Sequence, residues 1–596
     1  MSEIVKEVMS QIGNKQDRLM DVLLSIQKSE LYISEENIKS IAQELKISTI
    51  DVRQCMSFYH FFTTDIAKHR IYLNDSVMSN LRGRKEVLDA FELSLGSKLG
   101  QVNEQSIGLY STSCIGMSDQ EPAAIIDGKI FPSLTPERAM TIVEGLKEGK
   151  TAEQLYYLPL GDGRNSRPEL NTMVNNNIRK TGLLLDDYYK VGTALQIAIN
   201  KSELEVIGIV KTSGLRGRGG AGFPTGMKWE FCRASDGNRK YIICNADEGE
   251  PGTFKDRILL TEKIEMLFEG MAIAGFAIGA QEGIIYLRYE YLYLQEHIEK
   301  ALDTARENHL LGKQILGNES FDFDIRVQFG GGAYICGEES SLIESMEGKR
   351  GEPRFKPPFP VQKGYMNKPT SVNNVETLCK VCRIIENGGE WYKKYGTKQS
   401  VGTKLLSISG DCQREGVYEV EWGLTIKQML EMVGATNTQA VQVGGPSGNL
   451  IGPESFNRRI CYGDLATGGS MMIFDNSRDI IKDVVLNFLD FFIEESCGSC
   501  VSCRATTKQI TQKVRKMLQG NGVKQDLIDL KQWSKFTLVS RCGLGQTAAN
   551  PVTTSLSNLP HLYQNLINTD QDFISSFDMA SAVAESCKVV NRIPKI

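Results

Sequence analysis

Four cysteines have the spacing of an iron–sulfur ligand set. Cys497, Cys500 and Cys503 form a C-x2-C-x2-C run in ESCGSCVSCR, and Cys542 follows 39 residues later in RCGLG. Closely spaced thiolates can bind one face of a [4Fe-4S] cluster, and a distant fourth thiolate can complete the set. Zinc is the alternative, but zinc sites are typically built from separate C-x2-C pairs. The spacing therefore predicts a [4Fe-4S] cluster and electron transfer.

A glycine-rich segment, RGRGGAGFPTGMKWEF at 216–231, could bind phosphate. Gly217, Gly219 and Gly222 satisfy G-x-G-x-x-G, but a dinucleotide fingerprint also needs a preceding strand. The upstream LEVIGIVKTSG fits a helix as well as a strand, so an ordinary Rossmann unit is doubtful. Glycines let the backbone approach a ligand closely, and Arg218 and Lys228 supply positive charge. A flexible turn is the alternative interpretation.

Two later segments carry similar chemistry. ICNADEGEPGTFKDR at 243–257 is an apolar strand that ends in acids, where ligand groups collect in α/β sheets. Its polar side chains could hydrogen-bond a ribityl chain, a ribose or an amide, although a solvated acidic loop would look the same. A third segment, 330–360, places Glu338 and Glu339 after a glycine turn and before a Pro-rich aromatic loop. Three such segments predict a nucleotide cofactor.

The elements that must position these residues suggest a multidomain α/β chain. Helical periodicity in Leu19, Val22, Leu23 and Ile26 indicates a helical module, and HRIYL, IGLYS and the hairpin-like AAIIDGKIF indicate a compact α/β domain. LLSISG, VYEVEW and AVQVGG with a helix at 425–433 are typical of a β-grasp (ubiquitin-like) domain. The predicted division is a helical module 1–70, an α/β domain 71–150, a linker 151–190, a glycine-rich α/β domain 191–400, a β-grasp domain 401–475 and a helical, cysteine-bearing domain 476–596.

Composition excludes several functions. A net charge of −5 gives no sign of a nucleic-acid surface, and no apolar run reaches the ~18 to 20 residues of a membrane span. The five histidines are far apart, which argues against a histidine-based hydrolytic site. The amino terminus is unlike a signal peptide, and fourteen scattered cysteines suit a reducing compartment, so we expect a cytoplasmic protein without membrane insertion.

The motifs RGRGGAGFPTG, NADEGEPGTFKDR, GAYICGEE, KPPFP, SVNNVET and ESCGSCVSCR carry a resemblance. From about residue 190 to the end, the chain resembles the NADH-oxidising flavoprotein subunit of the respiratory complex I family. The resemblance implies that 191–400 is a Rossmann-like domain in which the glycine-rich loop and NNVET hold FMN and NAD(H) stacks over the flavin. It also implies that the four cysteines hold a [4Fe-4S] cluster.

Matching positions carry the family's binding residues into this chain. The implied FMN contacts are Gly217, Arg218, Gly219, Lys228, Asn245, Asp247, Glu248, Tyr334, Gly337, Glu338, Asn373, Asn374 and Thr377. The implied NAD(H) contacts are Phe223, Phe231, Glu250, Glu339, Lys356 and Phe359. Glu250 suits the hydroxyls of an adenosine ribose and disfavours a 2′-phosphate, which predicts NAD over NADP. No protein residue is expected to act as an acid or base, because the flavin carries the chemistry.

The amino-terminal part resembles the same family's thioredoxin-like [2Fe-2S] subunit, here joined ahead of the flavoprotein. The four ligand positions fall on Asn74, Ser79, Cys114 and Ser118. One thiolate cannot hold a [2Fe-2S] cluster in the usual way, so we expect a degenerate domain, kept as a structural or docking element. A ligand borrowed from elsewhere is the alternative.

The fusion and the degeneration together resemble one branch, the FMN-carrying diaphorase subunit of cytoplasmic NAD-reducing [NiFe] hydrogenases. That resemblance implies a subunit that exchanges a hydride between NAD(H) and FMN, and single electrons between FMN and the cluster. The implied partners are a small iron–sulfur diaphorase subunit and [NiFe] hydrogenase subunits, because this chain offers no [NiFe] ligand set. The alternatives are the same module on an NAD-dependent formate dehydrogenase or a complex I-like enzyme, and, more distantly, a non-enzymatic scaffold.

Overall fold

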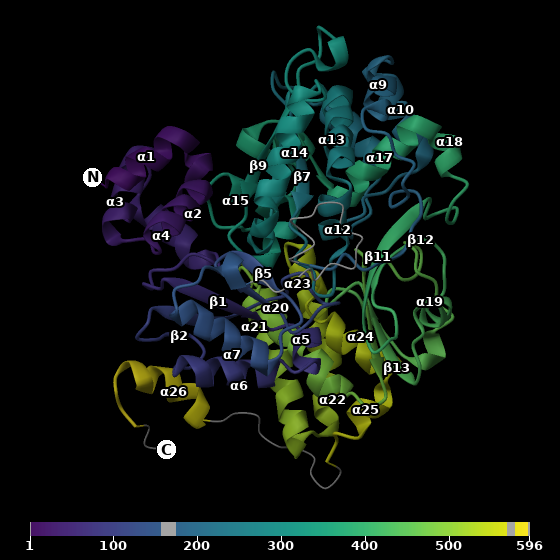
Figure 1. Cartoon of the computed structure of the whole chain (residues 1–596). Coiled ribbons are helices and arrows are strands. Elements are labelled where there is room, and N and C mark those ends of the chain that lie inside the picture. The colour runs from purple at the N-terminus through teal and green to yellow at the C-terminus, as the bar shows by residue number, and fades with distance from the viewer. Residues whose placement is uncertain (1, 156–173, 569–578, 594–596) are drawn as a thin grey trace. The chain divides into compact units, whose positions relative to one another are not determined.

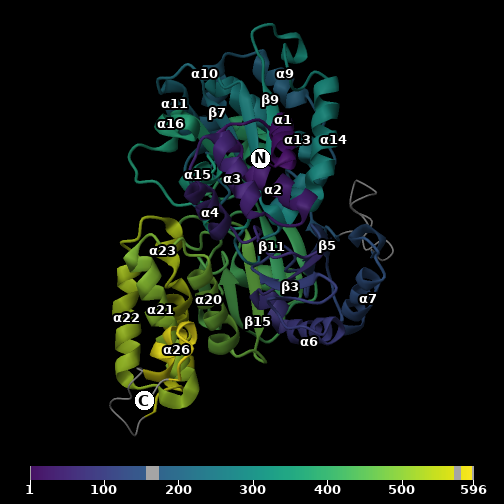
Figure 2. The same cartoon turned by 90° about the vertical axis from the view of Figure 1, so that its left-hand side faces the viewer.

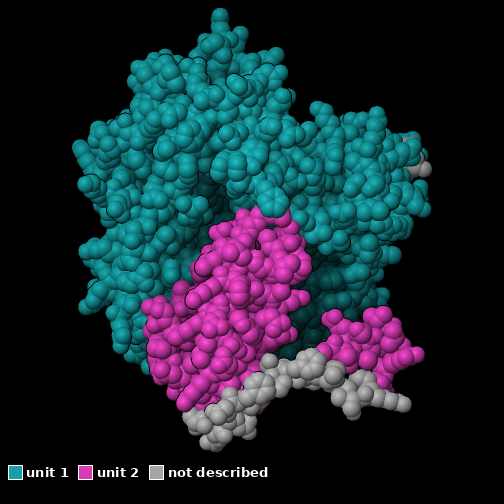
Figure 3. All heavy atoms as spheres, turned by 180° about the vertical axis from the view of Figure 1, so that it is seen from behind, with its two compact units in different colours: residues 1–477 teal, residues 478–596 magenta. Residues whose placement is uncertain are grey.

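The computed structural model describes residues 2–155, 174–568 and 579–593, with the backbone alone for 579–581. The chain divides into two compact units, 1–477 and 478–596 (Figure 3). Unit 1 carries the strands of the described residues, in three sheets, and unit 2 is helical. The predicted mixed α/β class is therefore confirmed.

Unit 1 opens with a module of four helices. Local capping fixes their starts: Ser34 accepts a hydrogen bond from the Asn37 backbone N–H at 3.1 Å, and Ser48 and Asp51 form a capping box. The apolar residues of the predicted helical stripe are buried, as the periodicity predicts. The helices are α1 (Glu3–Ile12), α2 (Leu19–Glu30), α3 (Glu35–Leu45) and α4 (Thr49–Phe58).

The next sheet contains the predicted strands and hairpin. Its order is β2-β3-β1-β4-β5, with β1 parallel to β3 and β4 antiparallel to both β1 and β5. The strands are β1 (His69–Asn74), β2 (Gln101–Val102), β3 (Ile107–Thr112), β4 (Ala124–Ile126) and β5 (Lys129–Phe131). The helices are α5 (Val77–Leu81), α6 (Arg84–Leu95) and α7 (Pro136–Lys147), and α6 packs against α7.

A four-stranded parallel sheet, in the order β10-β7-β8-β9, forms the centre of unit 1. Its strands are β7 (Tyr241–Ala246), β8 (Glu282–Leu287), β9 (Asp324–Phe329) and β10 (Thr370–Asn374). The helices of this region are α9 (Thr193–Ile199), α10 (Glu203–Ser213), α11 (Thr225–Ala234), α12 (Lys255–Glu262), α13 (Ile264–Ile278), α14 (Gln295–Glu307), α15 (Glu339–Met346), α16 (Pro360–Lys363), α17 (Val375–Asn387) and α18 (Gly389–Tyr392). Figures 1 and 2 show α13 and α14 beside this sheet, and α13 packs against β7 and β8.

Helix α13 is almost wholly buried, so its apolar sequence belongs to the core. Across the described ranges, no helix is long and apolar enough to cross a membrane.

The third sheet has the order β14-β13-β15-β11-β12-β6, with β15 parallel to β11. Its elements are β6 (Ile178–Lys180), β11 (Thr403–Gly410), β12 (Gly416–Glu421), α19 (Ile426–Val433), β13 (Thr438–Val443), β14 (Asn449–Ile451) and β15 (Ser470–Asp475). The strands LLSISG, VYEVEW and AVQVGG are confirmed. The β-grasp assignment of 401–475 stays a prediction.

The predicted linker 151–190 differs from a simple connection where the structure describes it. Residues 178–180 pair with β12 as an added strand, and Asn176 is fully buried. Its amide donates to Thr261 at 3.1 Å and Glu262 at 2.6 Å. The polar sequence is therefore buried with hydrogen-bond partners for the Asn176 amide NH2, while its Oδ1 has none. Residues 156–173 of the predicted linker lie outside the described residues.

Unit 2 consists of helices. A π-helical segment, Ile480–Val485, leads into α20 (Leu486–Glu494), and α21 packs against both α20 and α22 (Figure 2). The other helices are α21 (Val501–Lys516), α22 (Lys524–Thr537), α23 (Gly543–Thr547), α24 (Asn550–Asn558), α25 (Pro560–Gln564) and α26 (Met579–Val589). The helix predicted in IIKDVVLNFLDFF is confirmed, and its apolar side chains apart from Leu486 are buried.

Candidate functional site

The predicted nucleotide segments meet at one edge of the parallel sheet. Because β7, β8, β9 and β10 run in the same direction, their carboxyl ends share an edge. Asn245 stands near the end of β7 and Asp247 follows it, Asn373 and Asn374 end β10, and the glycine turn 330–332 follows β9. This is the edge at which ligands bind in open α/β sheets.

The glycine loop joins α10 to α11, so a helix precedes it and the Rossmann fingerprint does not apply. Its ends are held together by hydrogen bonds from Gly217 N to Phe223 O and from Thr225 N to Leu215 O, each 2.9 Å. A Cβ at Gly219 would lie 3.2 Å from the Asn374 Cβ, so the loop passes closely over the end of β10. Glycine keeps the backbone accessible where this approach leaves little space.

The structure corrects the predicted phosphate role of the Arg218 side chain. The guanidinium is fully buried, and each of its nitrogens donates to protein oxygens, among them the carbonyl of Val401 at 2.7 Å and the hydroxyl of Tyr392 at 2.9 Å. These bonds tie the loop to the third sheet. The Arg218 backbone N–H, in turn, donates to Thr377 Oγ1 at 2.8 Å, which joins the loop to α17.

Glu248 also serves the protein rather than presenting a free carboxylate. Its oxygens accept from the backbone N–H groups of Asp256 (2.8 Å) and Arg257 (3.1 Å), at the start of α12, and from the Tyr291 hydroxyl (2.9 Å). Burial, followed by the nearby Asp256 charge, raises the pKa of Glu248 to about 7. Glu248 therefore orders the loop after β7, and its direct contact with FMN stays a prediction. Asn245 bridges this loop to the next one by donating to Gly337 O at 2.8 Å.

Glu250 lies between two parts of unit 1. It accepts from the Tyr334 hydroxyl and from the Ser447 backbone N–H, the latter at 3.0 Å. Ser447 belongs to the turn between β13 and β14. Burial raises the pKa of Glu250 to about 7. A carboxylate has room for further donors, so ribose hydroxyls could add to these two bonds.

Lysines and acids alternate beside α15. Glu338 caps the helix by accepting from the Ser340 and Ser341 backbone N–H groups at 2.9 and 3.0 Å, and it also accepts from Lys356 at 2.7 Å. Glu339 pairs with Lys228 at 3.2 Å and with Lys356 at 3.3 Å.

Burial alone would raise the pKa of Glu339, but the charges of Lys228 and Lys356 hold it below its usual value. The lysines are neutralised within the protein, and an incoming phosphate would compete for them.

The end of β10 and the start of α17 carry a buried network that sequence reasoning missed. Asn374 caps α17, accepting from the Glu376 N–H at 3.0 Å, and donates to Asp256 at 2.6 Å. Lys255 lies 2.6 Å from Asp256 and 3.1 Å from Glu376. The motifs KDR and NNVET contain these residues, but their spacing alone does not show that they pair. Asn373 accepts from the Trp229 indole N–H at 3.3 Å.

Exposed aromatic side chains lie in the segments predicted to bind the nicotinamide nucleotide. Phe223, Phe231 and Phe359 are 44%, 46% and 49% exposed, and Phe355, which was not predicted, is 73% exposed. Large apolar side chains in water are costly unless something covers them. Their flat faces suit the stacking of a base.

These residues fit FMN. The close approach at Gly219 and the polar groups at the sheet edge could meet its phosphate and ribityl chain. The same residues would be unusual in a site for an apolar ligand.

In unit 2, two of the four predicted cluster ligands stand at helix starts. Cys500 immediately precedes α21 and Cys542 immediately precedes α23, where the helix dipole favours thiolates. The Arg541 backbone N–H points to Cys500 Sγ at 3.5 Å, and Ser496 Oγ lies 3.4 Å from Cys503 Sγ. Hydrogen bonds of this kind tune cluster sulfurs. Across the described residues, no three His, Cys, Asp or Glu side chains are placed to hold a single metal ion, whereas a cubane offers each thiolate its own iron.

Comparison with known proteins agrees with this geometry. Residues 210–383 match the Nuo51 FMN-binding domain, 483–566 match the NADH-ubiquinone oxidoreductase-F iron-sulfur binding region, and 5–147 match a thioredoxin-like [2Fe-2S] ferredoxin. The chain is 43% identical over 605 residues to the NAD-reducing hydrogenase HoxS subunit alpha of Cupriavidus necator, covering 100% of both chains. The chain belongs to the family of NAD-reducing hydrogenase alpha subunits.

Other relatives support this assignment. The chain is 42% identical to the NADP-reducing hydrogenase subunit HndC of Solidesulfovibrio fructosivorans, over 64% of this chain and 80% of that protein. A crystal structure of an NAD+-reducing [NiFe]-hydrogenase in the H2-reduced state superposes with a TM-score of 0.86 at 34% identity, covering 98% of both chains. The predicted family is confirmed, as are the predicted FMN-binding and [4Fe-4S]-binding regions. The individual contact residues stay predictions.

The amino-terminal region, which matches a thioredoxin-like [2Fe-2S] ferredoxin, does not fit a [2Fe-2S] cluster in this chain. Asn74, Ser79, Cys114 and Ser118 are at most 2% exposed, and three of these four positions offer an amide or hydroxyl instead of a thiolate. The Asn74 amide donates to Glu121, and Ser118 Oγ lies 3.7 Å from Cys114 Sγ. Thiolates hold [2Fe-2S] clusters, so this buried polar group takes the place of one.

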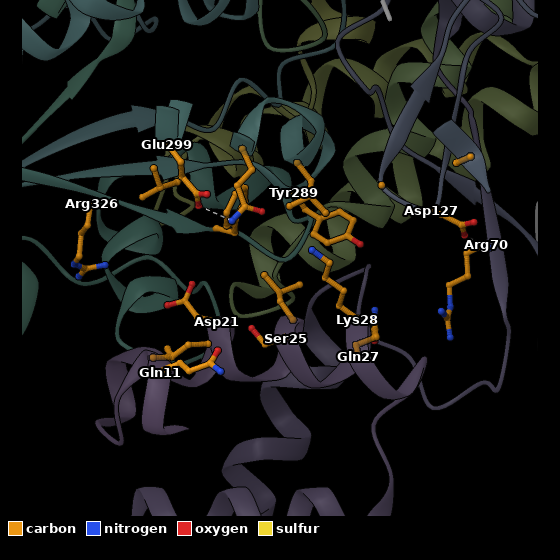
Figure 4. Close-up of a pocket in the computed structure, with 18 of the residues that line it drawn as sticks. Gln11, Asp21, Ser25, Gln27, Lys28, Arg70, Asp127, Tyr289, Glu299 and Arg326 are labelled. Atoms are coloured by element: carbon orange, nitrogen blue, oxygen red, sulfur yellow. Dashed lines mark hydrogen bonds between the residues drawn. The ribbon is translucent and has the colours of Figure 1, made fainter. Parts of the chain in front are cut away.

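A cavity of about 1030 Å³ lies elsewhere in unit 1 and contains none of the predicted site residues. Figure 4 shows its wall, where Asp21, Ser25 and Lys28 from α2 lie opposite Tyr289 and Glu299. Charges in the wall pair with one another, as in Arg18–Asp21 at 3.2 Å and His69–Asp127 at 2.7 Å. This pairing gives no ligand a clear preference.

Proposed function

We propose that the chain exchanges a hydride between NAD(H) and FMN at the sheet edge of unit 1. Single electrons then pass to or from a [4Fe-4S] cluster on Cys497, Cys500, Cys503 and Cys542. FMN supplies the conversion between two-electron and one-electron transfer when it is bound. The observation that carries this proposal is that the glycine loop, the acids after β7 and the asparagines that end β10 lie at one edge of one sheet.

The protein's part is placement. We expect FMN contacts at Gly217, Gly219 and Tyr334, with further contacts at Lys228, Asn245, Asp247, Glu248, Gly337, Glu338, Asn373, Asn374 and Thr377. Arg218, Glu248 and Glu338 hold the surrounding loops through their own hydrogen bonds. Correct placement of a nicotinamide against a flavin lowers the barrier by removing the entropy cost of the encounter.

The NAD(H) side of the site is built from stacking faces and one carboxylate. Phe223, Phe231 and Phe359 offer the faces, and Glu339 and Lys356 border them. Glu250 selects against a 2′-phosphate by charge repulsion, which gives NAD over NADP.

The proposed partners are a small iron–sulfur diaphorase subunit and [NiFe] hydrogenase subunits, which oxidise H2 while this chain reduces NAD+. Full-length similarity to a hydrogenase alpha subunit supports this choice. By contrast, the similarity to an NADH-quinone oxidoreductase chain of Aquifex aeolicus, at 41% identity, covers 64% of this chain. We place the enzyme in the cytoplasm, because a reducing compartment keeps thiolates available to an iron–sulfur cluster.

The test is anaerobic purification of the tagged chain with its partners. The complex should reduce NAD+ with H2, and the Cys500→Ala complex should lose that reaction while it still passes electrons from NADH to a dye that accepts them from the flavin. Reduction of NAD+ by formate instead of H2 would assign the module to a formate dehydrogenase. Co-purification with quinone-reducing membrane subunits would assign it to a complex I-like enzyme.

A further inference from the structure

The degenerate [2Fe-2S] domain raises the question of what its former ligand loop does. The loop runs from Cys114 to Asp119 after β3, and its cluster-position residues are buried. A loop that merely lost its cluster would be expected to gain solvent exposure. This loop instead contacts two arginines of the flavin-binding region, Arg288 and Arg257.

Arg288 joins the former ligand loop to the loop after β7. One end nitrogen donates to the Cys114 carbonyl at 2.7 Å, and the other donates to the Glu248 carbonyl. Arg288 itself follows β8 directly and is 3% exposed. The planar fork of arginine can hold two acceptors in fixed geometry, so the position of Cys114 sets the position of Glu248.

Asp119 makes the second connection. Its Oδ1 lies 3.5 Å from an end nitrogen of Arg257, and both side chains are 0% exposed. The Arg257 backbone N–H is also one of the groups that Glu248 caps, at 3.1 Å. A buried charge that loses its partner is strongly destabilising. Asp119 therefore neutralises the side chain of Arg257 in the first turn of α12, next to the loop that carries Asp247 and Glu250.

The helical module holds a second flavin loop independently. The His60 and Phe61 backbone N–H groups donate to the Gly332 and Gly331 carbonyls, each at 3.0 Å. A Cβ at Gly331 would lie 2.7 Å from the Tyr59 Cβ, so the two chains are in close contact. These glycines lead into the 3-10 turn Tyr334–Gly337, which carries predicted FMN contacts.

We infer that residues 1–147 act as a clamp that positions the two flavin loops, 247–257 and 330–337. Within this clamp, the former cluster loop, residues 114–119, holds the loop 247–257. Asp119 and Arg288 are positioning residues in this account, since they act through Glu248 and α12. The inference rests on the proposed FMN site. It assigns the amino-terminal domain, which lacks [2Fe-2S] ligands, a role in setting the FMN affinity and the midpoint potential of the flavin.

The test uses the full chain carrying Asp119→Asn, compared with Asp127→Asn. Asp127 is the matched control: it is an aspartate of the same domain, it pairs with His69 at 2.7 Å, and it accepts from the Arg70 backbone N–H of that domain at 2.9 Å. FMN is removed, and its dissociation constant is measured by fluorescence titration. The flavin midpoint potential is measured separately on the reloaded protein.

D119N should weaken FMN binding by at least about tenfold, because Arg257 is left buried without its counter-charge. It should also shift the flavin potential to a more positive value, because the uncompensated positive charge favours the more negative, reduced flavin. D127N should leave both within about twofold of wild type. The double variant D119N/R257Q, which has no uncompensated charge, should return the potential toward wild type.

A D119N protein with wild-type FMN affinity and potential would overturn the inference, even if its melting temperature fell. If D119N does not fold, Phe61→Leu tests the contact between the helical module and loop 330–337, because the Phe61 ring packs so closely on Gly332 that a Cβ there would clash with it. Unchanged FMN affinity in F61L would then overturn the clamp. Failure of the proposed function would appear differently, as a wild-type chain that binds no FMN.

Discussion

Replacing Glu250 with glutamine tests how the site chooses its nucleotide. The carboxylate already accepts from Tyr334 and Ser447, and the proposal adds ribose hydroxyls to it. Hydrogen bonds to a charged group contribute about 1.5–3 kcal/mol each, so losing the charge should lower kcat/KM for NADH by about 10- to 150-fold. NADPH should lose less, because the repulsion of its 2′-phosphate disappears at the same time.

The same substitution has a signature in stability. Burial raises the pKa of Glu250 from 4.5 to about 7, so the folded protein binds a proton more tightly than the unfolded chain. The cost of ionising this group grows as the pH rises from 4.5 and is complete above 7, where it amounts to about 3 kcal/mol. Glutamine carries no such cost, although it can leave one donor unpaired. The stability of E250Q relative to wild type should therefore rise by about 3 kcal/mol between pH 4.5 and 8.

Glu269→Gln is the matched control. Glu269 on α13 also accepts from a tyrosine hydroxyl, that of Tyr189, and from backbone N–H groups, and burial raises its pKa to about 7. E269Q should reproduce the pH-dependent stability without altering nucleotide preference. The assay is steady-state dye reduction with NADH and NADPH over a range of pH. An unchanged NADH/NADPH ratio in E250Q would refute the ribose role of Glu250.

Three further results are expected. Preference for NADH over NADPH should weaken as the pH falls through about 7, since protonated Glu250 no longer repels a 2′-phosphate; a preference that stays flat from pH 6 to 8 would contradict this. Glu376→Gln should destabilise the protein by about 3–5 kcal/mol in denaturant unfolding, because the fully buried Lys404 loses its counter-charge; the exposed Glu390→Gln should change nothing measurable, and equal effects would refute the reasoning. Cys500→Ala should remove the iron–sulfur absorption while Cys461→Ala keeps it, so a normal [4Fe-4S] spectrum in C500A would disprove the ligand assignment.

Local pattern was enough to predict much of the fold. LLSISG and VYEVEW alternate apolar side chains and form strands, the apolar HRIYL forms another, and IIKDVVLNFLDFF forms helix with most of its apolar side chains buried. The segment at 178–180 was missed as a strand because the NNN run before it is polar. In that run, the side-chain NH2 groups of Asn177 and Asn176 donate to Asp119 and Glu262, residues distant in sequence. Partners at that distance are invisible to local pattern.

The site shows the same limit. Residue type and spacing located the loops. Which partner each charged side chain bonds to depends on neighbours that the sequence does not show. Arg218 looks like a phosphate ligand in the sequence and instead satisfies carbonyls of 401 and 403. Glu248 also accepts hydrogen bonds from the first turn of α12, a role that its sequence neighbours do not indicate. Ser447 comes from the third sheet, and nothing near Glu250 in sequence predicts it.

An anaerobic NADH titration of the purified chain, with iron and flavin counted on the same sample, tests the central claim most directly. The account predicts one FMN that bleaches with NADH, and about four irons per chain, since the amino-terminal domain holds no cluster. Folded protein that binds no flavin and does not bleach would contradict the proposed function. An iron content near six, with a flavin present, would contradict the assignment of Asn74, Ser79 and Ser118 as lost ligands.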